Sequence, residues 1–212
     1  TGSDGHCRHK KQSGGAGQFG EVMLRVEPLA RGAGFEFVDI VKGGAIPGVF
    51  MAAVEKGVQQ ALAEGAVGGF PLHDLRVIVH DGKTHAVDGK EVAFVAAARK
   101  ATLQAVRAAT PIVLEPMVNI EVVAPEAAIG DLTGDLASKR GHITGTQPRP
   151  AATVAISGQM PLAELGDYQS RLKSLTGGQG SYSLAFSHYA QVGAEMQNKL
   201  AAAFKPDNLA DD

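Results

Sequence analysis

Two polar segments of this 212-residue chain carry the residue types that could do chemistry. The first is the basic run at residues 8–11, which leads into a glycine-rich loop that ends at Gly20. The second is the segment 83–88, which holds a lysine, a histidine and an aspartate. Lysines beside a loop of serine and glycine are typical of sites that contact phosphate, because cationic side chains and exposed main-chain N–H groups both favour anions.

The glycine-rich loop also fits nucleotide-binding patterns. Residues 15–20 read G-x-G-x-x-G, and Val22 extends them to the kinase pattern G-x-G-x-x-G-x-V. A dinucleotide site needs a strand before the glycines and a helix after them, whereas Val22, Leu24 and Val26 alternate with mostly charged residues and predict a strand after the loop. A kinase would also need H-R-D and D-F-G segments, which the sequence lacks. We therefore favour a flexible basic tip that touches RNA phosphates.

The remaining polar residues match no known pattern of catalytic or metal-binding residues. His80, Asp81, His85 and Asp88 could converge on a metal ion, but their spacing matches no metal motif. The sequence also contains neither a G-x-S-x-G segment nor a cysteine with a placed base. We expect no catalytic residue, no cofactor and no metal in this chain.

Three further groups have simpler interpretations than a site. Asp131 and Asp135 lie four residues apart on a predicted helix, which favours cap and surface roles over paired acid–base work. The histidines and the cysteine of residues 6–9 are typical of a disordered terminus. The glycines of residues 177–180 could cradle a phosphate, but a helix stop followed by a turn is the simpler interpretation.

Composition is that of a globular protein. Hydrophobic residues make up 44% and charged residues 20%, and no apolar run approaches the roughly 18 residues of a membrane span. The net charge is −2, with 13 basic and 11 acidic residues in 1–114 and 7 basic and 11 acidic residues in 115–212, so any RNA contact should be local. The single cysteine excludes an internal disulfide and fits the cytoplasm. The first residue is not methionine, which suggests a piece of a longer protein.

The elements that must position the two segments follow from hydrophobic periodicity. In the first half, period-two alternation predicts strands at residues 21–27, 35–41 and 75–80, and helical spacing predicts helices at 46–65 and 92–106. In the second half, strands are predicted at 118–122, 142–146, 153–157 and 182–186, with helices at 126–140 and 165–175. Lys139 and Arg140 should occupy the last helical turn, where cations favour the helix dipole. A short helix is predicted at 194–204.

The second half therefore has the order β-α-β-β-α-β, which is ferredoxin-like. RNA-recognition modules share this order, but they stack bases on exposed strand aromatics. The strands predicted here offer Asn119, Glu121, Thr153 and Ser157 instead. We interpret the second half as a docking domain rather than a reader of bases.

Six segments, in the right order and spacing between about residues 6 and 192, resemble the C-terminal portion of bacterial elongation factor G. They are residues 9–15 with 17–18, 41–47, 81–88, 114–116, 130–136 and 172–176. The resemblance implies an α+β chain with a domain similar to the second domain of ribosomal protein S5 at residues 1–114. It implies a ferredoxin-like domain V at 115–192, followed by a C-terminal helix and tail at 193–212. It also implies a left-handed βαβ crossover in the first domain, against the usual right-handed rule.

The resemblance also implies partners and contact residues. Domain IV of this family enters the decoding site of the small ribosomal subunit behind the mRNA–tRNA pair, and domain V docks near the stalk base of the large subunit. The first tip loop would be residues 12–15 and the second 83–88, and the expected contact residues are Lys10, Lys11, Gln12, Ser13, Gly14, Gly15, Lys83, His85 and Asp88. GTP and magnesium would bind an N-terminal domain that lies outside this chain. The chain described here should be a monomer and should not be an enzyme by itself.

Departures from the family pattern leave alternatives open. The family commonly has an arginine at the position of Ala16, a tyrosine at that of Phe19 and two arginines at residues 139–140, where this chain has Lys139 and Arg140. These differences are consistent with a divergent paralogue that acts in ribosome recycling or ribosome protection instead of translocation. An unrelated enzyme that uses the loop at residues 83–88 is the alternative of another class.

Overall fold

A computed structural model describes residues 1–12, 15 and 17–204 of the chain. These residues form two compact units. The first unit contains Thr1–Val113 and the segment that begins at Ala194, and the second contains Leu114–Gly193. Each unit has its own sheet and its own hydrophobic core, as the α+β expectation requires. None of the helices in the described ranges is long and apolar enough to cross a membrane.

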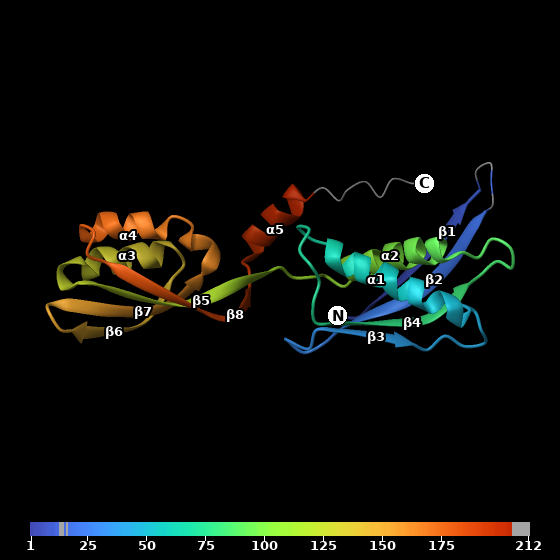
Figure 1. The fold of residues 1–212 in the computed structure, drawn as a ribbon, viewed down its shortest axis with the longest axis horizontal. Coiled ribbons are helices and arrows are strands. Elements are labelled where there is room, and N and C mark those ends of the chain that lie inside the picture. Colours follow the sequence, from blue (N-terminus) through green and yellow to red (C-terminus); the bar gives the residue numbers. More distant parts are fainter. Residues whose placement is uncertain (13–14, 16, 205–212) are drawn as a thin grey trace. The chain divides into compact units, whose positions relative to one another are not determined.

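The first unit is a four-stranded sheet with helices on one face (Figure 1). The strand order is β1-β2-β4-β3, in which β1, β2 and β4 are antiparallel neighbours while β3 and β4 run parallel. Its elements are β1 (Ser3–Lys11), β2 (Gln18–Pro28), β3 (Phe35–Asp39), the short 3-10 helix η1 (Gly48–Phe50), α1 (Met51–Glu64), β4 (Leu75–Lys83), α2 (Glu91–Ala108) and α5 (Ala194–Ala203).

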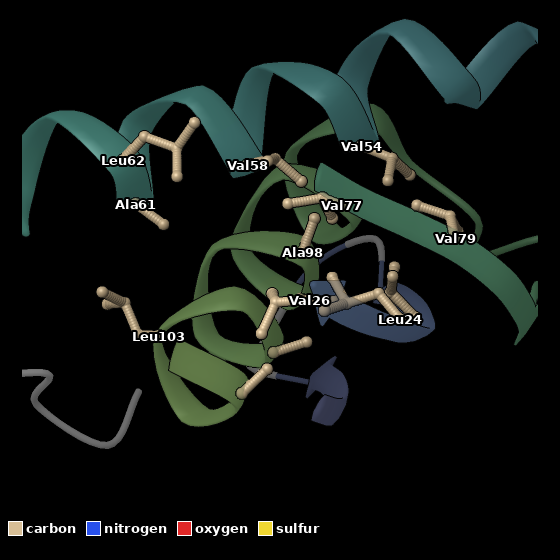
Figure 2. Close-up of a cluster of buried hydrophobic side chains, with 14 of the residues drawn as sticks. Leu24, Val26, Val54, Val58, Ala61, Leu62, Val77, Val79, Ala98 and Leu103 are labelled. Carbon is tan, nitrogen blue, oxygen red and sulfur yellow. The ribbon is translucent and has the colours of Figure 1, made fainter. Parts of the chain in front are cut away.

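The core of the first unit lies between its sheet and helices α1 and α2. Strand residues that alternate along β2 and β4 meet helix residues spaced three or four apart, which is the pattern expected for one buried face of each element. Figure 2 shows this cluster, which includes Leu24, Val26, Val54, Val58, Ala61, Leu62, Val77, Val79, Ala98 and Leu103. The apolar alternation in the sequence therefore predicts these elements correctly.

Strand β1 corrects the interpretation of the first residues as a disordered terminus. It pairs with β2 in unbroken register from Ser3 opposite Val26 to Lys11 opposite Gln18. Gly5 lies against helix α2, where an added Cβ would stand 2.1 Å from the main-chain oxygen of Ala101. A glycine at the close approach of strand and helix removes the apolar side chain on which alternation depends, so the sequence pattern hides this strand.

The second unit has the predicted βαββαβ order and the sheet order β6-β7-β5-β8, with antiparallel neighbours throughout. Its helices pack on one face of the sheet through a core that includes Ile120, Leu132, Ile156 and Leu172. Its elements are β5 (Leu114–Pro125), η2 (Glu126–Ala128), α3 (Ile129–Ser138), β6 (His142–Arg149), β7 (Thr153–Pro161), η3 (Leu162–Leu165), α4 (Tyr168–Thr176) and β8 (Ser181–Gln191).

The end of α3 differs from the prediction. The helix stops at Ser138, so Lys139 and Arg140 lie beyond its last turn. Lys139 bonds the carboxylate of Asp167 at 3.3 Å, and Arg140 binds Glu115 at 2.8 Å and Glu164 at 2.9 Å. The two cations therefore tie the helix end to neighbouring segments through ion pairs, which periodicity along one helix cannot reveal.

Asp135 is a second correction, because its carboxylate is buried and is not a surface group. It accepts a hydrogen bond from the Arg171 guanidinium on α4. The fully buried Tyr168 lies nearby, and burial together with the charge of Asp135 raises the pKa of its hydroxyl to about 12. A carboxylate paired across two helices stabilises their packing only while its partner is present.

Helix α5 belongs to the first unit although it follows the second in sequence. The side-chain amide of Gln197 accepts a bond from the Val113 N–H at 3.2 Å and donates one to the Pro111 carbonyl at 3.2 Å. Phe204 lies against Gly69, where an added Cβ would stand 3.0 Å from its ring. The predicted separate C-terminal segment 193–212 thus begins with a helix that packs on the first unit.

Candidate nucleic-acid interface

The two sequence segments meet at one end of the first unit (Figure 1). Strand β1 ends there at Lys11, β2 begins there at Gln18, and the connection from β4 to α2 crosses the same end. The Phe19 N–H donates to the carbonyl of Asp88 at 2.7 Å, and Phe19 also forms a bridge with Gly89. We call the described residues 10–12, 15, 17–19 and 83–89 the tip.

The β4–α2 loop is folded on itself by His85. The imidazole Nδ1 accepts the main-chain N–H of Val87 at 3.3 Å and that of Asp88 at 3.2 Å, while the His85 carbonyl accepts the Gly89 N–H at 2.9 Å. Gly89 has no room for a side chain, because a Cβ would stand 2.5 Å from Oγ1 of Thr84. One side chain therefore sets the path of the whole loop.

The His85 ring itself lies largely in solvent, with 55% of its side chain exposed. Oδ2 of Asp88 stands 3.4 Å from Nδ1 of this ring. The Phe19 ring lies with its centroid 6.2 Å from that of the imidazole, at an interplanar angle of 55°. Phe19 and Asp88 therefore flank the histidine from the two loops.

Asp88 also fixes the first loop by steric contact. A Cβ on Gly17 would stand 2.6 Å from both Cγ and Oδ1 of Asp88, so the main chain of the first loop lies directly against this carboxylate. Only glycine allows that approach without a shift of its neighbour. Sequence reasoning misses this contact, because the sequence shows Gly17 only as part of a glycine pattern.

The charged groups next to the tip are already paired with one another. Glu21 on β2 is buried and accepts hydrogen bonds from Arg8 at 3.0 Å and from His6 at 2.7 Å. Burial alone would raise the pKa of Glu21, but these bonds and the charges of Arg8 and Lys83 outweigh it and lower the pKa. Arg8 is thus neutralised by a buried carboxylate.

Lys10 and Lys83 remain as the exposed cations of the tip. Lys10 stands opposite Phe19, and Lys83 stands opposite Glu21 in the sheet register. Both side chains are exposed. The charge of Lys83 acts on the buried Glu21, but neither lysine forms a close ion pair with another described residue. Two solvated ammonium groups beside an exposed imidazole form a surface suited to phosphate oxygens.

The other predicted contact residues are only partly placed. Lys11 is the last residue of β1, and Gln12 and Gly15 are exposed just beyond it. Ser13 and Gly14 lie outside the described residues. The glycine pattern leads into β2 and not into a helix, so the described residues supply no helix N-terminus for a pyrophosphate there. No group of three or more potential metal ligands occurs within the described ranges.

The second unit presents a different surface that sequence reasoning missed. Its edge strand β8 exposes Leu184, Phe186 and Tyr189, and the last two rings lie 5.3 Å apart. The opposite face of the sheet carries polar groups: Gln159 donates to Asn119 at 2.8 Å, and Arg149 forms an ion pair with Glu121 at 3.7 Å. Exposed aromatic groups are thus present, but they lie on the edge strand and not in the middle of the sheet.

Comparison with known proteins decides the family. The family model described as elongation factor G, domain IV, matches residues 2–110, and the model described as elongation factor G C-terminus matches residues 112–200. This chain belongs to the elongation factor G family. The resemblance seen in the sequence is therefore confirmed, with the tip on the domain IV part.

Individual relatives agree with this assignment. An elongation factor G-like protein of Thermotoga maritima is 42% identical, and an elongation factor G of Dehalococcoides mccartyi is 45% identical, each over 91% of this chain. A crystal structure of a Thermus thermophilus protein matches 95% of the chain with a TM-score of 0.78 and 37% identity. The chain spans 28% of the length of the two curated relatives and 30% of the solved one.

Proposed function

We propose that this chain is the ribosome-contacting part of a translation factor, and that its tip enters the decoding site of the small subunit during tRNA–mRNA translocation. The observation that carries the proposal is the joining of the two tip loops through Phe19, Gly17 and Asp88, beside the exposed Lys10 and Lys83. Such a surface positions itself on RNA phosphates without reading sequence. Membership of the elongation factor G family supports the same function.

The rest of the proposal concerns the longer protein. The second unit docks near the stalk base of the large subunit, in the cytoplasm, and the factor acts as a monomer. GTP and magnesium bind an N-terminal domain of the longer protein, so this chain acts as a lever and wedge and is not itself the enzyme. We expect no thermal stabilisation of the 212-residue chain by GTP with magnesium, and a clear shift in melting temperature would contradict this division of labour.

Salt-dependent binding to purified small ribosomal subunits tests the role of the tip. The double variant Lys10→Ala/Lys83→Ala should bind more weakly, and the slope of log K against log salt should fall by about two, because each lost phosphate contact removes about one unit. The control Lys56→Ala/Arg107→Ala removes two exposed charges from the helices of the same unit. Equal losses in both variants would show that overall charge, and not the tip, governs binding.

A second function within the same family is favoured by the tip sequence itself. This chain has Ala16 where the family commonly has an arginine, so it lacks that cation. It has Phe19 where the family commonly has a tyrosine, and the Phe19 ring lies beside that of His85. These changes suit a paralogue that acts in ribosome recycling or protection. Excess chain added to a reconstituted translation system separates the two: competition with translocation slows peptide elongation, whereas competition with recycling slows only the release of ribosomes after termination.

A further inference from the structure

We infer that the two ring nitrogens of His85 do separate jobs: Nδ1 holds the loop together, and Nε2 carries the proton and donates it to an acceptor atom of RNA. The RNA half of this inference rests on the proposed function. The loop half rests only on the geometry of residues 85–89.

The geometry assigns Nδ1 as an acceptor. Two main-chain N–H groups, those of Val87 and Asp88, point at this single atom from 3.3 and 3.2 Å. An imidazole nitrogen can accept a hydrogen bond only when it bears no proton, and in a neutral ring the proton then sits on the other nitrogen. The loop thereby selects the Nε2–H form of His85.

Asp88 offers the competing arrangement. Its Oδ2 stands 3.4 Å from the same Nδ1, so a neutral ring that carried its proton on Nδ1 would donate a hydrogen bond to this carboxylate. That tautomer would give up two main-chain hydrogen bonds for one bond to a carboxylate that is partly exposed to water. The number of hydrogen bonds therefore favours the two amide groups over the carboxylate as the partners of Nδ1.

The remaining donor is presented to the exterior. Nε2 takes part in no hydrogen bond with another described residue, and more than half of the side chain is exposed. The Phe19 ring lies beside the imidazole, with the two ring centroids 6.2 Å apart. A single fixed N–H donor beside Lys10 and Lys83 fits a hydrogen-bond acceptor on an RNA strand, either a phosphate oxygen or an acceptor on a base.

Two substitutions separate the two jobs. In His85→Asn, the side-chain oxygen takes the place of Nδ1 and can accept the N–H groups two and three residues ahead, as asparagine does in turns. The shorter asparagine has no group at the position of Nε2. Gln places an N–H₂ group near the position of Nε2 and leaves the loop amides without their partner. His85→Asn thus keeps the loop and loses the donor, while His85→Gln does the reverse.

The first measurement needs no RNA. In the full chain with ¹⁵N-labelled histidine, NMR should show the neutral His85 ring protonated at Nε2 and unprotonated at Nδ1. Amide exchange at Val87 and Asp88 should match that of the unchanged chain in His85→Asn and become faster in His85→Gln. A neutral ring protonated at Nδ1, or equal exchange in both variants, would overturn the assignment of the loop.

The second measurement is binding to small ribosomal subunits. We expect His85→Gln to bind within about twofold of the unchanged chain and His85→Asn to bind about tenfold more weakly, because only the first keeps the outward donor. The reverse order, or equal binding, would overturn the RNA half of the inference. If the unchanged chain itself does not bind, the proposed function fails, and the NMR result still decides the tautomer.

Discussion

At each end of the sheet in the first unit, one side chain accepts hydrogen bonds from two main-chain N–H groups, but the two ends serve different purposes. At the far end, between β2 and β3, Oδ1 of Asp74 accepts the N–H groups of Gly32 and Gly34, both at 3.0 Å. At the tip, Nδ1 of His85 accepts the N–H groups of Val87 and Asp88. In both places one side chain satisfies two main-chain donors that a turn would otherwise leave to water.

The reach of the two side chains differs. Asp74 bonds residues 40 and 42 positions away in sequence, and its own carbonyl accepts the Leu29 N–H at 2.8 Å, so it joins the connection between β2 and β3 to the start of β4. Nδ1 of His85 bonds residues two and three positions ahead, so these hydrogen bonds join only parts of its own loop. The far end uses this bonding for stability. The tip uses the same bonding to hold the exposed His85 ring in place. Loss of these bonds should reduce the free energy of unfolding only slightly.

The largest expected effect is therefore at the far end. Asp74→Ala should lower the free energy of unfolding by about 2 kcal/mol, because it removes the acceptor of two N–H groups and places alanine at φ 60°. Urea unfolding of the full chain measures the change. Asp74→Asn keeps an acceptor oxygen and tolerates this backbone conformation, so it should lose less than half as much. Equal losses would show that the two bonds are not the cause.

The charge of Asp74 gives the far end a pH dependence. Hydrogen bonds from Gly34 and then Gly32 lower the pKa of Asp74 in the folded chain. The stabilisation from this charge is therefore fully present above the unfolded pKa of about 3.9, and it is lost as the pH falls through the folded pKa. The difference in unfolding free energy between the unchanged chain and Asp74→Asn should be constant from about pH 7 to about pH 5 and shrink below about pH 4. A difference that grows on acidification would contradict the cited bonds.

A smaller effect is expected where the first loop meets the second. Gly17→Ala places a Cβ against the carboxylate of Asp88, but that carboxylate is the end of a side chain and can move. We expect a loss of about 1 kcal/mol in unfolding free energy, within the range for moderate overpacking. Asp88→Ala should remove most of this loss in the double variant, because the two sites contact each other. Simple additivity of the two changes would mean that the contact does not exist.

Local patterns in the sequence predict strands of the first unit, but not the contacts between distant residues. Strand β2 follows from the alternation of Val22, Leu24 and Val26 with mostly polar residues, and β4 follows in the same way from Leu75, Val77 and Val79. The RNA-contact residues of the tip come from the family resemblance alone and stay a prediction. The contact of Gly17 with Asp88 joins positions 71 residues apart and leaves no local pattern. Burial of Asp135 is hidden for the same reason, since its partner Arg171 lies on another helix. Such contacts depend on how the elements pack, which periodicity within one element does not specify.

The smallest change in stability is expected for His85→Ala. The side chain is largely exposed and its hydrogen-bond partners lie within its own loop, so water can replace these bonds. The unfolding free energy should therefore change by no more than about 0.5 kcal/mol. Binding to small ribosomal subunits should nevertheless fall about tenfold, because the variant loses both the hydrogen bonds that hold the loop and the outward N–H donor.

Val87→Ala is the matched control, since Val87 is 80% exposed in the same loop and has no side-chain polar group. If His85→Ala destabilises the chain as much as Asp74→Ala does, the two ends serve the same structural purpose and the tip has no special role. If Val87→Ala weakens binding equally, the surface of the loop matters, and its histidine does not.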